Sequence, residues 1–268
     1  MSGLAFSKYE GLGNDFVVID AATEALLDPA LAIRMCDRHF GIGADGVLLV
    51  LPPVSQRARA RMVVLNADGS RPEMCGNGVR CVALHLALRD NQQVGSLTID
   101  TDAGPRAITL EREGGVASAA VEMGQALVEA ELSRTYRGRQ LSFMRVSMGN
   151  PHAICFDADL NAGELDELGP LISAAVPGGT NVESVTMCSA REFELLVWER
   201  GVGRTLACGT GACAAAVAAA VSGRSPFDLP IHVSLPGGAL EITVRGGTLA
   251  VTMSGPARLV FSGESRIQ

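Results

Sequence analysis

Lysine and long apolar runs are both scarce in this sequence of 268 residues. Lys8 is the single lysine, and every other basic residue except histidine is arginine. An enzyme that uses pyridoxal phosphate holds this cofactor on a lysine. Lys8 lies in an N-terminal strand-like pattern, away from any loop suited to cradling a phosphate. We therefore expect chemistry without a cofactor.

An excess of basic residues is also absent. The 22 Lys and Arg residues face 29 Asp and Glu residues, so the formal net charge is −7. This balance argues against sequence-independent nucleic-acid binding, which needs a basic face. The apolar run that ends at Val221 is far shorter than the roughly 20 residues of a membrane span. With no signal pattern in MSGLAFSKYEGLG, we expect a soluble, cytoplasmic protein that binds no membrane.

The seven cysteines are an odd number, in a chain too long to need disulfides for stability. The spacings of Cys75 with Cys81 and of Cys208 with Cys213 are wider than zinc knuckles favour, so we expect no metal. We interpret Cys81 and Cys213 as small core residues on helices. The remaining three, Cys36, Cys155 and Cys188, are expected to be buried and inert.

Short segments rich in β-branched residues and bounded by Gly or Pro predict many strands. Helices are expected from Asp28-Pro29, after Gly78, over residues 163–175, and from Gly211 to near Gly223. The strands and helices do not alternate regularly. This pattern indicates an α+β fold rather than a doubly wound sheet.

Two stretches, EMCGNGVRCVALHLAL from Glu73 and LACGTGACAAAVAAAV from Leu206, share a cysteine, Gly-x-Gly and an apolar run. Further pairs match in the same order: residues 13–19 with 149–155, 41–47 with 177–183, 101–109 with 235–243, and 121–124 with 251–255. Similar Gly-rich turns are the simpler explanation of each pair alone. Together they predict two homologous lobes, residues 1–114 with 255–268, and 115–254.

Cys-Gly-x-Gly at a helix start leaves backbone N–H groups uncovered, so an anion can bind there. The same positive helix end is expected to lower the pKa of the cysteine. Two such thiols across a symmetric seam suggest inversion of a carbon stereocentre, one removing the α-proton while the other delivers a proton. The helix ends would stabilise the enediolate charge on the substrate carboxylate.

Other interpretations of the glycines and cysteines are weaker. GIGADG (residues 41–46) has the spacing of a dinucleotide-binding loop but follows a helix and enters a strand, the reverse of the required order. Gly209, Gly211 and Ala214 also match that spacing, but Asp228 then lies in a loop-like segment. Two opposed thiols would also be able to form a disulfide, which we expect to be inactivating.

At these motifs the chain resembles diaminopimelate epimerase, a cofactor-independent enzyme of lysine biosynthesis. The resemblance rests on GLGNDFVVID, DRHFGIGADG, NADGSRPEMCGNGVRC, MGNPHA, GTNVESV and ERGVGRTLACGTGACA, and covers nearly the whole chain. It implies two pseudo-symmetric α+β lobes, each a curved, mostly antiparallel sheet around a central helix, with the active site in the cleft between them. It also implies conversion of LL-2,6-diaminopimelate to the meso form, and a homodimer.

The resemblance assigns roles to individual residues. Cys75 and Cys208 would be the acid/base pair, with His152 and Glu199 near the reacting amino group and setting the state of the thiols. The substrate-binding residues would be Gly76, Asn77, Gly209 and Thr210 at the reacting carboxylate, and Asn14, Asn66, Asn150, Asn181 and Arg200 elsewhere, with Arg200 on the distal carboxylate. The simpler alternatives are turn asparagines, a strand histidine and a surface ion pair. Asn66 and Glu199, equally far before the two cysteines, favour function.

Two positions depart from the family pattern. Arg204 stands where the family commonly has Glu, and Gly46 where some members have Gln. A proline or hydroxyproline racemase remains an alternative, although a histidine would then be expected in place of Asn77. A non-catalytic amino-acid-binding protein of the same fold is another, and it would need neither thiol.

Overall fold

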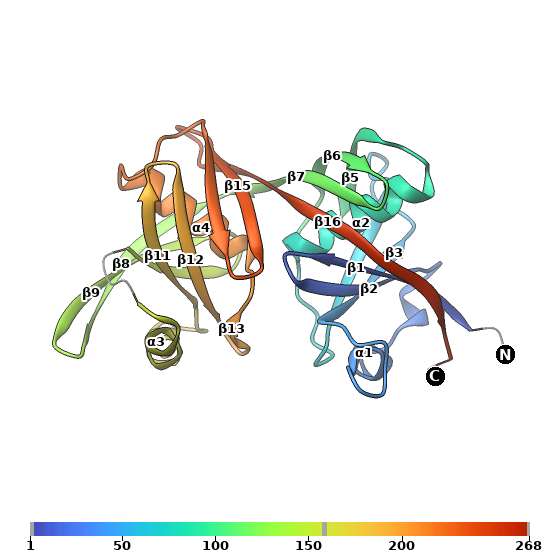
Figure 1. The fold of residues 1–268 in the computed structure, drawn as a ribbon, viewed down its shortest axis with the longest axis horizontal. Coiled ribbons are helices and arrows are strands. Elements are labelled where there is room, and N and C mark those ends of the chain that lie inside the picture. Colours follow the sequence, from blue (N-terminus) through green and yellow to red (C-terminus); the bar gives the residue numbers. More distant parts are fainter. Residues whose placement is uncertain (1–2, 157–159, 267–268) are drawn as a thin grey trace. The chain divides into compact units, whose positions relative to one another are not determined.

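The computed structural model describes residues 3–156 and 160–266, which form two compact units. Unit 1 comprises residues 1–121 and 255–268, and unit 2 comprises residues 122–254. The sequence-based division at 114/115 differs from this one, because the chain leaves unit 1 inside a single strand, β7 (Val116–Gln125). Strands far outnumber helices in both units, so the predicted α+β class is confirmed (Figure 1).

Unit 1 alternates paired strands with three helical segments. Its elements are β1 (Leu4–Gly11), β2 (Asn14–Asp20), the short 3-10 helix η1 (Glu24–Leu26), α1 (Pro29–Cys36), β3 (Gly46–Leu51), β4 (Ala60–Asn66), α2 (Gly76–Arg89), β5 (Val94–Asp100), β6 (Arg106–Glu113) and the first part of β7. Asp28 caps α1 by accepting from the Leu31 N–H at 2.6 Å, and Pro29 follows it, as the sequence predicted.

Unit 2 repeats this order with its own segments. Its elements are β8 (Leu127–Tyr136), β9 (Arg139–Ser147), β10 (Pro151–Cys155), α3 (Ala162–Ala174), β11 (Asn181–Ser189), β12 (Glu192–Glu199), β13 (Gly203–Thr205), α4 (Gly209–Val221), β14 (Pro230–Leu235), β15 (Gly238–Val244) and β16 (Ala250–Ser265), whose later part belongs to unit 1. A capping box between Asn161 and Glu164 starts α3.

The two units share one pattern of strand pairing. In unit 1, β2–β3 and β4–β5 are parallel, while β1–β2, β3–β4, β5–β6 and β6–β7 are antiparallel. In unit 2, β10–β11 and β12–β14 are parallel, while β9–β10, β11–β12, β14–β15 and β15–β16 are antiparallel. The same sequence of pairings in each unit agrees with the repeat seen in the sequence.

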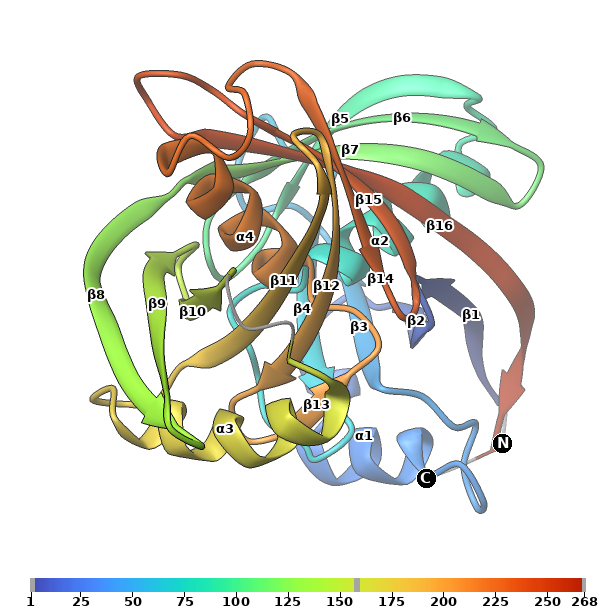
Figure 2. The same ribbon diagram turned by 60° about the vertical axis from the view of Figure 1, so that its left-hand side comes forward.

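A buried helix occupies the same place in each pattern. α2 contacts β1 to β6, and α4 contacts β9, β10, β11, β14 and β15 (Figure 2). α4 is mostly alanine and valine around its whole circumference, and such a helix is stable only when it is enclosed. Both helices begin at the residue after the cysteine, earlier than the glycines expected to precede them, so Gly76 and Gly209 already belong to the first turns.

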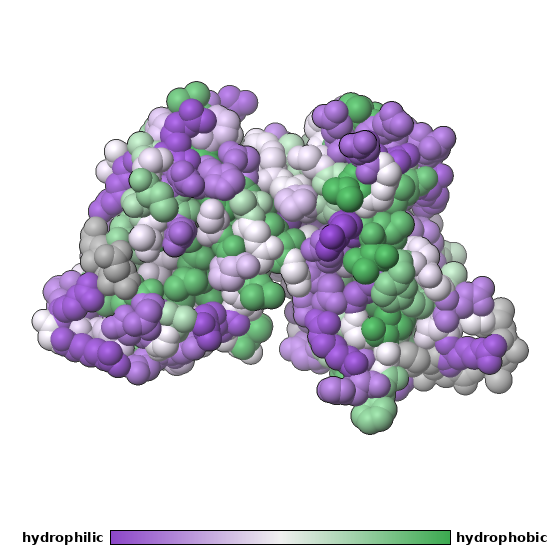
Figure 3. All heavy atoms as spheres, viewed as in Figure 1, coloured by the Kyte–Doolittle hydropathy of each residue, from purple (hydrophilic) through white to green (hydrophobic). Residues whose placement is uncertain are grey.

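No helix in the described ranges is long and apolar enough to cross a membrane. The visible face of each unit carries hydrophilic and hydrophobic residues side by side (Figure 3). Among the described residues, the most exposed large apolar side chain is Phe40, in the loop before β3, at 91% exposure.

Candidate functional site

Each repeated cysteine caps the helix that follows it. Cys75 Sγ accepts a hydrogen bond from the Gly78 N–H at 3.4 Å, and Cys208 Sγ accepts one from the Gly211 N–H at the same distance. A Cβ atom added to Gly78 would lie 3.4 Å from Cys75 Cβ, and one added to Gly211 would lie 3.3 Å from Cys208 Cβ. Glycine at both positions thus lets the sulfur sit directly over the unpaired N–H groups of the first turn.

Two of the expected asparagines meet beside Cys75. Asn77 Nδ2 donates to Asn14 Oδ1 at 3.2 Å, and Asn14 Nδ2 donates to Asp45 Oδ2 at 2.7 Å. Arg80, which is fully buried, donates from Nη2 to Asn77 Oδ1 at 2.9 Å. Both amides are therefore held in one orientation by charged groups on either side.

An ion-pair network lies behind these asparagines. Lys8 Nζ lies 2.6 Å from Asp15 Oδ2 and also donates to the Gly43 carbonyl, and Arg38 bridges Asp15 and Asp45 at 2.7 Å each. Burial opposes ionisation of Asp15, yet hydrogen bonds from Arg38 and Lys8 outweigh it and lower its pKa to about 2. The only lysine is thus engaged in a structural ion pair.

Asn66 ends β4, where its Nδ2 donates to Ser70 Oγ at 2.9 Å. Its register partner on β3 is Gly46. A Cβ atom at Gly46 would lie 2.8 Å from the Leu65 carbonyl oxygen, so this backbone leaves no room for a side chain there. This close approach accounts for glycine at position 46.

A chain of hydrogen bonds runs to Cys208 in unit 2. Thr210 Oγ1 lies 3.4 Å from Cys208 Sγ, and Asn150 Nδ2 donates to Thr210 Oγ1 at 3.3 Å. His152 Nε2 lies 3.1 Å from Asn150 Oδ1, and His152 Nδ1 lies 2.6 Å from Glu183 Oε1. The structure therefore joins His152, Asn150 and Thr210, three residues that the sequence had singled out.

Glu183 is a member of this chain that the sequence analysis missed. It is fully buried in β11, and its Oε2 atom has no hydrogen-bond partner among the described residues. Leaving a buried polar atom unpaired costs about 1–3 kcal/mol, a cost that is often found at functional sites. The available signal was a glutamate inside NVESV, a segment otherwise suited to a buried strand.

Glu199 is a second carboxyl group in contact with Cys208. Thr205 Oγ1 donates to Glu199 Oε1 at 2.6 Å. Burial raises the pKa of Glu199 and the charge of Glu183 adds to this, while Thr205, His152 and the Cys208 thiol act in the opposite sense. A carboxyl group with a raised pKa beside a thiol is suited to exchange a proton with it.

The expectation of a lowered cysteine pKa is wrong for Cys208. Burial raises its pKa well above the ordinary value, and the charges of Glu199 and Glu183 raise it further. The hydrogen bonds from Thr210 and the Gly211 N–H favour the thiolate but do not offset these effects. Burial and the two neighbouring carboxylates therefore favour the thiol form of Cys208 over the thiolate.

Asn181 and Arg200 lie next to each other at the ends of β11 and β12. Asn181 Oδ1 accepts from the Arg200 N–H at 2.9 Å, and Arg200 Nη1 donates to the carbonyl oxygens of Gly178 and Gly179. These contacts fix the position of the guanidinium group. They use only the N–H donors of Nη1, out of the five donors that the group carries. The charge of Arg204 is balanced locally, since its Nε lies 3.3 Å from Asp166 Oδ1 on α3.

The other cysteines follow the expectation with one exception. Cys36, Cys81, Cys155 and Cys213 are buried, but Cys188 is exposed near the end of β11, because β11 leaves the core there. The described residues contain no cluster of His, Cys, Asp or Glu that would hold a metal ion.

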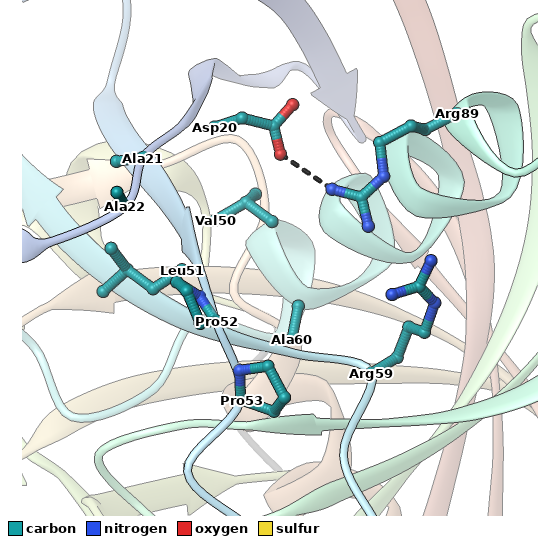
Figure 4. A pocket seen from close by; sticks show the side chains of 10 residues that line it. All are labelled: Asp20, Ala21, Ala22, Val50, Leu51, Pro52, Pro53, Arg59, Ala60 and Arg89. Atoms are coloured by element: carbon teal, nitrogen blue, oxygen red, sulfur yellow. Dashed lines mark hydrogen bonds and ion pairs between the residues drawn. The ribbon is translucent and has the colours of Figure 1, made fainter.

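A separate cavity of about 450 Å³ lies on unit 1 and is drawn in Figure 4. Its apolar floor includes Val50 and Leu51, and Asp20, Arg59 and Arg89 line its edge. Arg89 donates to Asp20 at 3.0 Å and Arg59 donates to Asp90 at 2.9 Å, so both positive charges are already compensated. None of the expected site residues lines it.

Comparison with known proteins decides the family. A family profile described as diaminopimelate epimerase matches residues 6–128 and 144–260. The chain belongs to the diaminopimelate epimerase family. It is 44% identical to the diaminopimelate epimerase of Gloeothece citriformis (strain PCC 7424), over 97% of this chain and 98% of that protein. It is also 44% identical to that of Desulforudis audaxviator (strain MP104C), over 97% and 99%.

Solved structures share the fold at lower identity. A probable proline racemase from Agrobacterium radiobacter K84 has a TM-score of 0.78 and 16% identity, covering 99% of this chain and 93% of that chain. A phenazine biosynthesis protein of the PhzF family from Bacillus anthracis has a TM-score of 0.78 and 18% identity, covering the whole of both chains. These likenesses establish the fold of this member of the epimerase family, not its substrate.

Proposed function

We propose that this protein converts LL-2,6-diaminopimelate to the meso form in lysine biosynthesis, without a cofactor, using Cys75 and Cys208 as its acid/base pair. One observation carries the proposal. In a member of the diaminopimelate epimerase family, both units place a thiol at the same capping position of a buried helix, with the same 3.4 Å bond from the first turn.

The reaction requires each sulfur to reach the same α-carbon from opposite faces. A thiolate takes the α-proton, the C–H electrons move into the carboxylate as an enediolate, and the opposing thiol protonates the carbon from the other side. The N–H groups of Gly76, Asn77, Gly209 and Thr210 bind the reacting carboxylate. Because they point at the developing negative charge, they stabilise the enediolate more than the substrate.

We assign the proton-donor role in the resting protein to Cys208. The support is its raised pKa, which has its origin in burial and in the charges of Glu199 and Glu183. In the opposite direction Cys208 must lose its proton, and Glu199, which contacts Cys208 and has a raised pKa, is the carboxyl group suited to accept it. His152 acts with Glu199 near the reacting amino group.

The remaining polar side chains hold the rest of the substrate. These are Asn14, Asn66, Asn150, Asn181 and Arg200, of which Arg200 binds the distal carboxylate. Arg200 suits this role because its anchored guanidinium keeps N–H donors of Nη2 and Nε beyond those used by the loop.

Incubation with LL-diaminopimelate in D₂O tests the function. We expect deuterium at one α-carbon, observed by proton NMR, together with equilibration to the meso form. Cys75→Ala and Cys208→Ala should each reduce turnover by about 10²–10⁴-fold or more, as loss of a positioned acid or base predicts. Cys188→Ala changes an exposed thiol and is the matched control.

Two outcomes would refute the assignment. Turnover retained in either Cys75→Ala or Cys208→Ala would exclude the two-thiol mechanism. Faster racemisation of proline than of diaminopimelate would make the protein a proline racemase. A second copy of the chain is the partner expected from the family resemblance, and sedimentation equilibrium measures whether a dimer forms.

A further inference from the structure

The hydrogen-bond chain of unit 2 ends at the sulfur of Cys208. It runs from Glu183 through His152, Asn150 and Thr210 to Cys208 Sγ, with separations of 2.6, 3.1, 3.3 and 3.4 Å. Both nitrogens of the His152 ring face an acceptor, Glu183 Oε1 on one side and Asn150 Oδ1 on the other. If the ring donates to both of these acceptors, it is an imidazolium.

The rest of the chain follows from this state. Asn150 accepts at Oδ1, so its Nδ2 donates to Thr210 Oγ1. The hydroxyl of Thr210 then accepts that bond, and its own proton points at the sulfur. With a neutral His152 ring that keeps its proton on Nδ1 for Glu183, the Asn150 amide would turn over to donate to Nε2, and the Thr210 hydroxyl would donate to Asn150 rather than to Cys208.

We propose that Glu183 is a positioning residue for Cys208. By holding the His152 ring as an imidazolium, it directs the Thr210 hydroxyl proton toward the sulfur and stabilises the thiolate that forms when Cys208 gives up its proton. The carboxylate of Glu183 also packs against the first turn of α4, since a Cβ atom at Gly211 would lie 2.8 Å from its Oε1. This inference rests on the proposed acid/base role of Cys208.

Direct electrostatics predicts the opposite effect. The carboxyl groups that act on Cys208 are Glu183 from β11 and Glu199 from β12, with His152 from β10 acting on Glu199, and α4 itself carries no charged side chain. Taken alone, the charge of Glu183 disfavours the thiolate. When His152 is an imidazolium it cancels that charge, and removing Glu183 removes both charges together. Only the direction of the hydrogen bonds then changes.

The test measures how fast iodoacetamide alkylates Cys208 in the substrate-free protein, followed by mass spectrometry of the peptide that contains it. Only the thiolate reacts, so the rate at fixed pH reports its population. Glu183→Gln keeps the size of the side chain and an acceptor for Nδ1–H. We expect it to slow alkylation by about tenfold, the effect of one pKa unit. A rate that is unchanged or faster would overturn the proposal.

Glu199→Gln is the matched control, because the same change removes the other carboxylate. The charge of Glu199 disfavours the Cys208 thiolate, and Glu199 does not belong to the hydrogen-bond chain. We therefore expect faster alkylation of Cys208 in Glu199→Gln. Slowing by Glu183→Gln together with acceleration by Glu199→Gln supports the directed chain. Acceleration by both would show that Glu183 acts through its charge alone.

Thr210→Val provides a second test that does not depend on a buried substitution, because Thr210 is only half-buried. It should slow alkylation as Glu183→Gln does, whereas Thr210→Ser, which retains the hydroxyl, should react at the rate of the unmodified protein. The double variant should be no slower than either single one, since one break already interrupts the chain. Additive slowing, or normal reactivity of Thr210→Val, would refute the connection.

These results are independent of the proposed function. Alkylation is measured without substrate, so a protein that fails to incorporate deuterium into diaminopimelate would overturn the function while leaving the chain intact. Conversely, normal epimerisation with unaltered alkylation in Glu183→Gln would overturn only the role of Glu183.

Discussion

Replacing Gly169 by alanine tests how α3 supports the strand that carries Glu199. Gly169 lies in α3 and faces Trp198 on β12, the residue just before Glu199. A Cβ atom at Gly169 would lie 2.3 Å from Trp198 Cγ and 2.4 Å from Cδ2. Carbon atoms in contact are about 3.5–4.0 Å apart, so the indole ring must move by more than about 1 Å.

The magnitude follows from two opposing effects. Overpacking a core costs about 1–3 kcal/mol, whereas alanine in place of glycine within a helix gains about 0.5–1 kcal/mol. Gly163→Ala in the same helix is the matched control, because its Cβ atom would meet only Asn161 Oδ1, at 3.4 Å. The helix gain largely cancels between the two variants. We therefore expect Gly169→Ala to be less stable than Gly163→Ala by about 1–3 kcal/mol.

Urea unfolding followed by fluorescence measures this difference directly, since Trp198 is the single tryptophan of the chain. The midpoint should fall while the slope stays unchanged, as expected when only stability changes. In a Gly169→Ala, Trp198→Leu double variant, the smaller leucine leaves room for the added Cβ atom. Its urea unfolding, followed by circular dichroism, should show that part of the lost stability is recovered, with a coupling energy of about 0.5–3 kcal/mol between the two substitutions. Equal midpoints for Gly169→Ala and Gly163→Ala would refute the packing argument.

Three further predictions concern charge and titration. Burial raises the pKa of Cys36 to about 11, so its contribution to stability is full below the unfolded pKa and is lost as pH rises from about 9 to 11. Urea titrations at a series of pH values should show that the unfolding free energy of Cys36→Ala falls by about 1.4 kcal/mol less per pH unit in that window than that of the unmodified protein. Equal falls in the two proteins would contradict this prediction. Arg204→Ala, which breaks an exposed pair with Asp166, should change the unfolding free energy by no more than about 1 kcal/mol. Asp45→Asn removes the carboxylate that holds Asn14, and steady-state kinetics should show KM rising more than kcat falls; a normal KM would count against a substrate-binding role for Asn14.

The architecture and half of the candidate site were predictable because their signals are local. A cysteine followed by Gly-x-Gly specifies a capped helix within four residues, and this geometry is the same at Cys75 and Cys208. The division into two similar lobes was predictable because the same motifs occur twice in the same order. The start of each helix was placed too late, since glycine usually weakens a helix, whereas here Gly76 and Gly209 lie in the first turn, where the cap compensates.

The ionisation of the site depended on residues distant in the chain. Local sequence places Cys208 at a positive helix end, which by itself lowers a thiol pKa. Only the folded unit buries that sulfur and brings Glu183 and Glu199 to it from neighbouring strands, which reverses the sign of the shift. The sequence alone thus determined that two thiols cap two helices, because capping is set by adjacent residues. Tertiary structure decided which groups surround Cys208, because strand register and burial determine its charge environment.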